Sequence, residues 1–245
     1  MNYLEHIGKY FIMLGRVFKK PQRSKVFYEA LLREIEDLGL KSLGIIMFIS
    51  FFIGGVISLQ TALNLESGLT PKYLIGYASR ESLILEFSPT LISIILAGKV
   101  GSFITSSIGT MRVTEQIDAL EVMGVNSLNY LVFPKIVALL MYPFVIGISM
   151  FLGIFGGWLA CAYGGFSTSQ DFIQGAQIEF IPFHIAYAFI KTFGFALILA
   201  TIPSFHGYYM KGGALEVGKA STVSFVWTSV TSILVNYILT QLLLT

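Results

Sequence analysis

One stretch of the chain, from Ser42 to Leu65, contains no charged side chain. A helix needs about 20 consecutive apolar residues to cross the hydrocarbon core of a bilayer, so this stretch predicts a membrane span at residues 43–63. The composition agrees, because 55% of the 245 residues are hydrophobic and only 12% are charged, whereas soluble domains contain roughly 25% charged residues. We therefore expect a chain whose surroundings are largely lipid.

The same reasoning predicts an all-α integral membrane protein with five spans. The run that begins at Phe87 reaches span length only if it includes Lys99, and a lysine there can face protein or extend its charged end toward the interface. The uncharged run from Ile136 to Gln170 is too short for two spans and a turn, so it forms one span, with a kink expected at Pro143. The four further spans are predicted at residues 87–108, 136–163, 183–205 and 225–244, with polar connections at 64–82 and 164–181.

Residues 1–41 precede the five-span domain, 42–245, and carry half of the 16 lysines and arginines. Apolar side chains recur here at helical spacing: Leu4, Ile7, Phe11, Leu14 and Phe18. A basic amphipathic helix of this kind lies in the membrane interface. Basic residues favour the cytoplasmic side, so we expect a cytoplasmic N-terminus and, after five spans, a C-terminus on the opposite side.

A compact charged cluster interrupts the apolar sequence at residues 109–124. Thr110 is a suitable N-cap, and the spacing that follows predicts a short amphipathic helix at 110–123. Its apolar positions are Val113, Ile117 and Leu120, and its polar positions are Arg112, Glu115, Gln116, Asp118 and Glu121. Such a helix between two spans suits binding in a groove of another protein. The alternative is a loop helix that is simply exposed to solvent.

Few residues of the spans could carry chemistry. A carboxylate against hydrocarbon is costly and is by default a functional candidate, which singles out Glu86. The alternative is a water-exposed charge at the start of a helix, favoured by the helix dipole. Lys99 and Lys191 raise the same question, but lysines near a span end usually extend to the interface, so we rank them below Glu86.

Other site classes are not indicated by the sequence. Gly213–Ala220 reads G-x-x-x-x-G-K, but the motif requires Ser or Thr where Ala220 stands and a strand where a membrane span precedes it. No Cys/His spacing suggests a metal site, and the net charge of +2 gives no reason to expect nucleic acid. Gly101, Gly153 and Gly157 belong to rows of small residues at i+4 spacing and are expected to allow close helix packing.

The chain resembles the MlaE/YrbE family of permeases, the membrane subunits of ABC-type lipid transporters in double-membraned bacteria and plastids. The resemblance covers most of the chain, and residues 109–124 match the family's cytoplasmic coupling segment. Leu85–Pro89 resembles its Arg-Glu-(Leu/Phe)-Gly-Pro, and Ala97–Gly101 its Ala-Gly-Arg-Val-Gly. Here Leu85, Ser88 and Lys99 replace Arg, Gly and Arg, and Asn236 replaces an Asp of the last span.

The resemblance implies a homodimer in the inner membrane, with its C-terminus periplasmic. A cytoplasmic ABC ATPase that binds ATP and Mg²⁺ would contact the 110–123 helix, sometimes with a STAS-domain protein, and an MCE-domain oligomer would lie on the periplasmic side. Phospholipid would occupy a cavity between two permease copies, with Glu86, Phe87, Pro89 and Leu59 expected along it. The alternatives are an ion-coupled carrier that uses Lys99 and Lys191, and a membrane scaffold that transports nothing.

Overall fold

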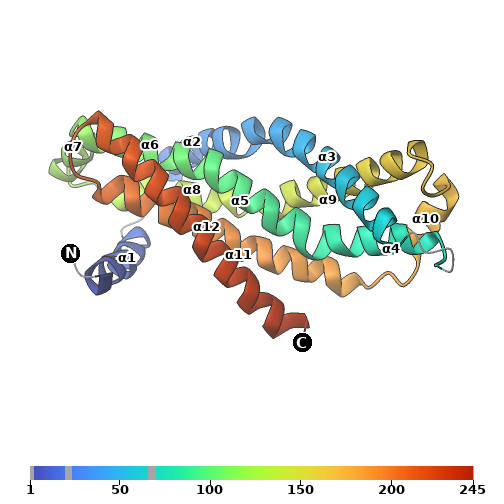
Figure 1. Ribbon diagram of the computed structural model, residues 1–245. Coiled ribbons are helices and arrows are strands. Elements are labelled where there is room, and N and C mark those ends of the chain that lie inside the picture. The colour runs from blue at the N-terminus through green and yellow to red at the C-terminus, as the bar shows by residue number, and fades with distance from the viewer. Residues whose placement is uncertain (1–2, 20–23, 66–69, 245) are drawn as a thin grey trace. The chain divides into compact units, whose positions relative to one another are not determined.

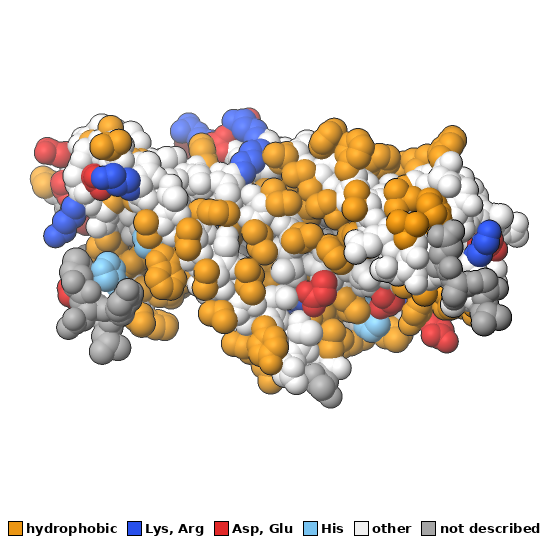
Figure 2. All heavy atoms as spheres, in the orientation of Figure 1, with side chains coloured by type: hydrophobic (Ala, Val, Ile, Leu, Met, Phe, Trp, Pro, Cys, Tyr) orange, Lys and Arg blue, Asp and Glu red, His pale blue; other side chains and the backbone are white. Residues whose placement is uncertain are grey.

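The computed structural model describes residues 3–19, 24–65 and 70–244, and all regular secondary structure in these ranges is helical (Figure 1). Within these described ranges, five helical segments are long and apolar enough to cross a membrane, which confirms the predicted all-α class and the number of spans. Large apolar side chains are exposed on these segments, as expected of residues that face lipid, and Figure 2 shows many hydrophobic side chains on one face of the molecule. The segments are Lys25–Asn64, Tyr73–Val113, Ser127–Tyr163, Pro182–Tyr209 and Ala214–Leu244.

The second segment begins earlier than predicted. The helix α4 (Tyr73–Ser82) continues without a break into a π-helical stretch, η2 (Leu83–Leu91). Residues 73–82 of the predicted polar connection are therefore helical. The segment then continues through α5 (Ile92–Leu96), the π-helical η3 (Ala97–Gly101) and α6 (Ser102–Val113).

The described residues divide into two compact units. The first combines residues within 1–42, 94–142 and 194–238. It contains the N-terminal helices α1 (Tyr3–Val17) and α2 (Ser24–Glu34), the π-helical η1 (Ile35–Leu40), and α8 (Ser127–Leu139).

The helix α1 is fixed to α8 by one buried side and by side-chain hydrogen bonds to its last turn. Met13 and Val17 are fully buried. The side chain of Asn129 donates to the carbonyl of Val17, and that of Asn126 donates to the carbonyl of Arg16 at 2.9 Å. Since these carbonyls have no partner within α1, α8 caps the end of α1.

The second unit combines residues within 43–93, 143–193 and 239–245. Its centre is a close contact between α3 (Lys41–Asn64) and α9 (Tyr142–Tyr163). A Cβ atom at Gly54 would overlap the carbonyl of Gly153, and one at Gly157 would overlap the hydroxyl of Ser58. The small residues thus bring the two backbones into direct contact, which larger side chains would prevent.

A short helix that the sequence analysis missed, α10 (Ser169–Gln177), lies in the predicted connection 164–181. Thr168 is its N-cap, because the Thr168 hydroxyl accepts from the backbone N–H of Asp171 and also donates to the Asp171 carboxylate. At its other end the buried guanidinium of Arg80 donates to the carbonyls of Ala176 and Ile178 at 2.9 and 2.8 Å. The first turn of α10 is therefore capped from within the segment, and its last carbonyls accept from a residue of α4.

Instead of the kink expected at Pro143, the structure has a break between two helices just before this residue. The helix α8 ends at Leu139, and α9 begins at Tyr142, which places Pro143 in its first turn. Proline is tolerated there because the first N–H groups of a helix have no partner within the helix. The remaining spans are α11 (Pro182–Tyr209) and α12 (Ala214–Leu244).

Candidate functional site

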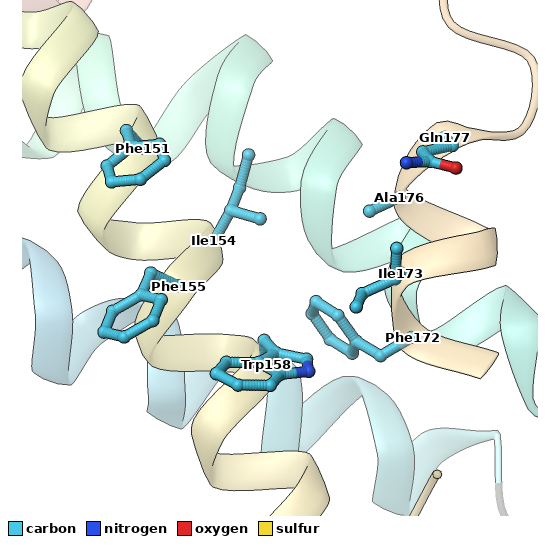
Figure 3. A pocket seen from close by; sticks show the side chains of 8 residues that line it. All are labelled: Phe151, Ile154, Phe155, Trp158, Phe172, Ile173, Ala176 and Gln177. Carbon is cyan, nitrogen blue, oxygen red and sulfur yellow. The ribbon is translucent and has the colours of Figure 1, made fainter. Parts of the chain in front are cut away.

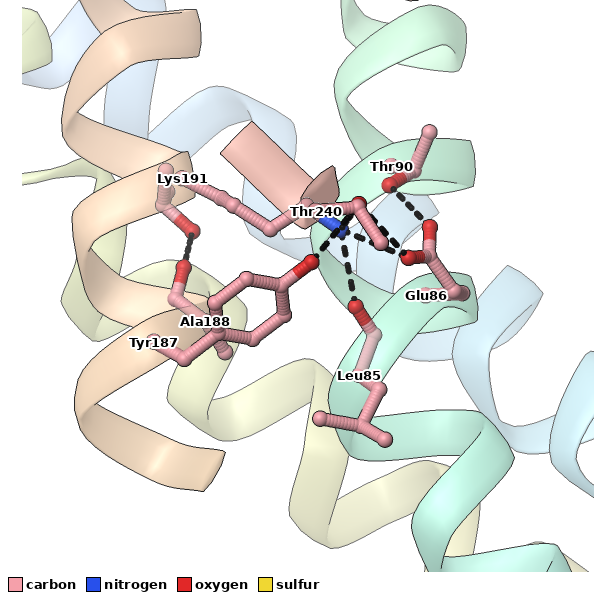
Figure 4. Close-up of polar contacts among 8 residues, drawn as sticks. Leu85, Glu86, Thr90, Tyr187, Ala188, Lys191 and Thr240 are labelled. Carbon is pink, nitrogen blue, oxygen red and sulfur yellow. Dashed lines mark hydrogen bonds and ion pairs between the residues drawn. The ribbon is translucent and has the colours of Figure 1, made fainter. Parts of the chain in front are cut away.

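The second unit contains an ion pair between two of the singled-out residues. The ammonium of Lys191, on α11, lies 2.9 Å from Oε1 of Glu86, in η2 (Figure 4). The Lys191 side chain is completely buried, whereas 41% of the Glu86 side chain is exposed. An unpaired charge in such surroundings is costly, so each group makes the other tolerable inside a membrane protein.

Hydroxyl groups complete this polar cluster. The hydroxyl of Thr240, on α12, donates to Glu86 Oε1 at 3.3 Å, and that of Thr90 donates to Oε2 at 3.2 Å. Tyr187 lies 2.8 Å from the Thr240 oxygen. Because the single proton of Thr240 goes to Glu86, Tyr187 is the donor in that bond. The Tyr187 ring also lies 4.7 Å from the Lys191 ammonium, a cation–π contact.

The backbone of η2 contributes an acceptor to the cluster. The carbonyl of Leu85, in the π-helical η2, lies toward Lys191. The Lys191 ammonium donates to that carbonyl at 3.0 Å. The ammonium thus contacts the Leu85 carbonyl, the Glu86 carboxylate and, at 3.5 Å, the Thr240 hydroxyl, which matches its three N–H groups.

These contacts correct two expectations. Glu86 does not start a helix, because the helical segment begins at Tyr73, so the explanation by a helix-terminal charge fails. Lys191 does not extend to the interface, because it is fully buried and paired, and it ranks with Glu86 rather than below it. Lys99 is different: it is exposed and donates to the backbone carbonyl of Lys41.

The charged segment 109–124 is built differently from the single helix predicted at 110–123. Thr110 lies inside α6, where its carbonyl accepts from the backbone of Thr114, and so it is not an N-cap. The helix breaks at Glu115, whose φ of 59° is in the left-handed region, and α7 (Gln116–Val122) follows. Gly124 ends α7 with a φ of 74°, in the manner of a glycine C-cap.

The break disperses the charged row. Arg112 pairs with Asp118 across it at 2.7 Å. Glu121 accepts hydrogen bonds from Ser127 at 3.0 Å and from Tyr208 at 2.8 Å, which fasten α7 to α8 and α11 within the first unit.

The apolar positions of this segment are also dispersed. Ile117 is fully buried, while Val113 and Leu120 are half-buried. The side chains most exposed at the end of α7 are Val122, at 89%, and Met123, at 68%, and the sequence analysis did not single out either of them.

The remaining predicted residues occupy different surroundings. Leu59 and Phe87 are half-buried, and Pro89 is buried and so is not an exposed wall of a cavity. Gly101 lies against Pro203 and Gly153 against Leu83, where an added Cβ would lie 3.3 and 3.2 Å from these side chains.

Sequence reasoning missed the partners of Glu86. It weighed Lys191 alone, although an acid and a base in two different spans are each costly unless paired. That shared cost was the available signal. Tyr187 and Thr240 gave none, because hydroxyl residues are common in spans without any such role.

The chain is similar to proteins of known family. A family model described as permease MlaE matches residues 31–242. A probable ABC transporter permease protein of Rickettsia bellii is 31% identical over 97% of this chain and 92% of its own length. The intermembrane phospholipid transport system permease protein MlaE of Haemophilus influenzae is 30% identical over 95% of this chain and 89% of its own. The chloroplastic protein TRIGALACTOSYLDIACYLGLYCEROL 1 of Arabidopsis thaliana is 29% identical over 94% of this chain and 66% of its own length.

Proposed function

Because this chain belongs to the MlaE permease family, we propose that it moves phospholipid between the inner and outer membranes of a double-membraned bacterium. It is a multi-pass ABC transporter permease, the membrane subunit that works with an ATPase. Phospholipid as substrate, and the inner membrane as location, are inferred from the relative in Haemophilus influenzae, whose name states intermembrane phospholipid transport.

The observation that carries the lipid substrate is the half-exposed Glu86 carboxylate. It is a polar acceptor held in place by Lys191 and Thr240 in a chain whose exposed span residues are mainly apolar. A phospholipid requires both kinds of surface, apolar for its acyl chains and polar for its head group. The carboxylate can accept hydrogen bonds from ammonium or hydroxyl groups of the head group.

We assign ATPase docking to the α7 tip, the exposed side chains Glu115, Asp118, Val122 and Met123. This surface combines acidic groups with apolar side chains, which suits a groove lined by basic residues. ATP and Mg²⁺ would bind in the ATPase. The permease would act as a homodimer with a periplasmic MCE-domain oligomer, and a STAS-domain protein is a further cytoplasmic partner.

The double variant Glu115→Lys with Asp118→Lys tests the docking and the function together. We expect it to insert in the membrane, since no span changes, but to lose the co-purifying ATPase. Like charges facing one another across an interface cost several kcal/mol. The measurements are ATPase recovery in mild detergent and ATP-dependent transfer of a fluorescent phospholipid by the reconstituted complex.

Arg112→Ala is the matched control. It also breaks the pair of Arg112 with Asp118, which is exposed and therefore worth little, but it leaves the acidic surface intact. We expect this variant to retain the ATPase. Normal ATPase recovery and lipid transfer by the double variant would refute docking at the α7 tip, and a wild-type complex that moves no phospholipid would refute the proposed function.

A further inference from the structure

A cavity lies between α9 and α10, and none of the residues that line it belongs to the Glu86 cluster (Figure 3). Its volume is about 350 Å³, within the range of small-ligand sites. From α9, Phe151, Ile154, Phe155 and Trp158 project into it from successive turns. Phe151 is 69% exposed and Phe155 is 41% exposed, so the opening is lined by aromatic rings of a membrane span.

The opposite wall, α10, cannot move in to close this cavity. Phe172 is fully buried in a small core, and Ile173 beside it is 45% exposed at the opening. On its other side α10 touches α4 backbone to backbone, because a Cβ at Gly175 would overlap the carbonyl of Tyr73. Arg80 holds its last carbonyls. Because α10 is fixed to α4, it does not fill the space toward α9. An empty apolar space is unfavourable, so binding of an apolar ligand there would stabilise the protein.

The lining identifies the occupant as a hydrocarbon chain. Apolar cavities stay dry and bind apolar ligands. The opening lies on a helix that crosses the membrane, where the surrounding molecules are lipids. Trp158 lies five residues before the end of α9 at Tyr163, about 7.5 Å along the helix axis, a depth near the interface that tryptophan favours.

The polar groups of the cavity fit one end of a phospholipid chain. Gln177, at the end of α10, lines it and carries amide N–H donors. An ester carbonyl is the acceptor that a glycerophospholipid carries at this depth. We propose that the α9–α10 cavity binds one acyl chain of a membrane phospholipid, as a resident lipid that is not the transported one.

Tryptophan fluorescence tests this directly, because the chain has two tryptophans, Trp158 and Trp227. Trp227→Phe leaves Trp158 as the reporter in the purified full-length chain. Phosphatidylcholine brominated on its acyl chains, titrated into the detergent micelles, quenches tryptophan on contact. We expect quenching of Trp158 that saturates at a low mole fraction of lipid. Trp158→Phe leaves Trp227, which is 47% exposed, and its quenching should rise in proportion to the bulk lipid.

Filling the cavity should abolish the saturable signal. In the Trp227→Phe background, Ala176→Phe places a ring in the space from α10, and we expect at least a tenfold weaker response to the brominated lipid. Ala176→Leu is the milder variant if the larger side chain prevents folding, which thermal unfolding will show. Proportional quenching of Trp158, or saturation that neither substitution changes, would overturn the proposal. Lipid transfer by the reconstituted complex is measured separately, so the proposed function stands or falls independently.

Discussion

Replacing Glu86 with leucine should strongly destabilise the protein and abolish phospholipid transfer. The substitution leaves the fully buried ammonium of Lys191 without an anionic partner, in contact with a backbone carbonyl, a hydroxyl and the Tyr187 ring. Removing one partner of a buried ion pair costs about 3–5 kcal/mol. Thermal unfolding in detergent and ATP-dependent lipid transfer measure the two effects.

The double variant Glu86→Leu with Lys191→Met separates stability from function. With both charges gone no buried charge remains unpaired, and apolar replacements for a buried pair are often neutral for stability. We expect unfolding close to wild type, whereas lipid transfer stays lost because the acceptor is missing. If the double variant were as unstable as the sum of the single variants Glu86→Leu and Lys191→Met, the two residues would not be energetically coupled.

Two glycine-to-alanine substitutions in α3 should change the free energy of unfolding in opposite directions. At Gly54 an added Cβ would overlap the carbonyl of Gly153 on α9, backbone atoms that cannot move without separating the helices. We expect a loss of about 3 kcal/mol or more, at the upper end of overpacking effects. At Gly44 nothing lies within 4 Å, so alanine there should gain the ordinary helix propensity, about 0.5–1 kcal/mol.

Thermal unfolding of the purified Gly54→Ala and Gly44→Ala proteins, side by side in one detergent, compares the same chemical change in one helix. Equal effects at the two positions would mean that α3 and α9 are not in backbone contact in the membrane protein. Serine at Gly54 should behave like alanine, because the overlap involves Cβ itself.

The fold class could be predicted because a helix is stable across a bilayer when its apolar run is long enough to cover the hydrocarbon core. Ser42–Leu65 needed no tertiary information, and five runs predicted five spans. The second span was misjudged at its start because Arg80 and Glu81 read as polar surface. Arg80 is 2% exposed, pairs with the adjacent Glu81 and donates to the carbonyls at the end of α10, which lie nearly a hundred positions away in the chain.

Of the residues in the polar cluster, the sequence singled out Glu86 first but did not show which residues pair with it. Glu86 could be singled out from its cost in hydrocarbon, but its partners lie on α11 and α12, and no sequence spacing relates them. The segment 110–123 shows a different limit. Its apolar spacing fits one helix, yet the chain breaks at Glu115, since a left-handed residue other than glycine is set by tertiary contacts rather than by local preference.

The π-helical stretch η2 makes the polar cluster sensitive to the number of residues before it. A π turn holds one residue more than an α turn, and each residue rotates a helix by about 100°. The stretch therefore absorbs one extra residue that lets Glu86 meet Lys191 while Gly76 of α4 meets α10. In evolutionary terms, we expect insertions and deletions across Leu83–Leu91 to be tolerated less well than substitutions, because only a change in length rotates the helix. Deleting one residue would rotate Gly76, which contacts α10, relative to Glu86, so that the two contacts could not form together.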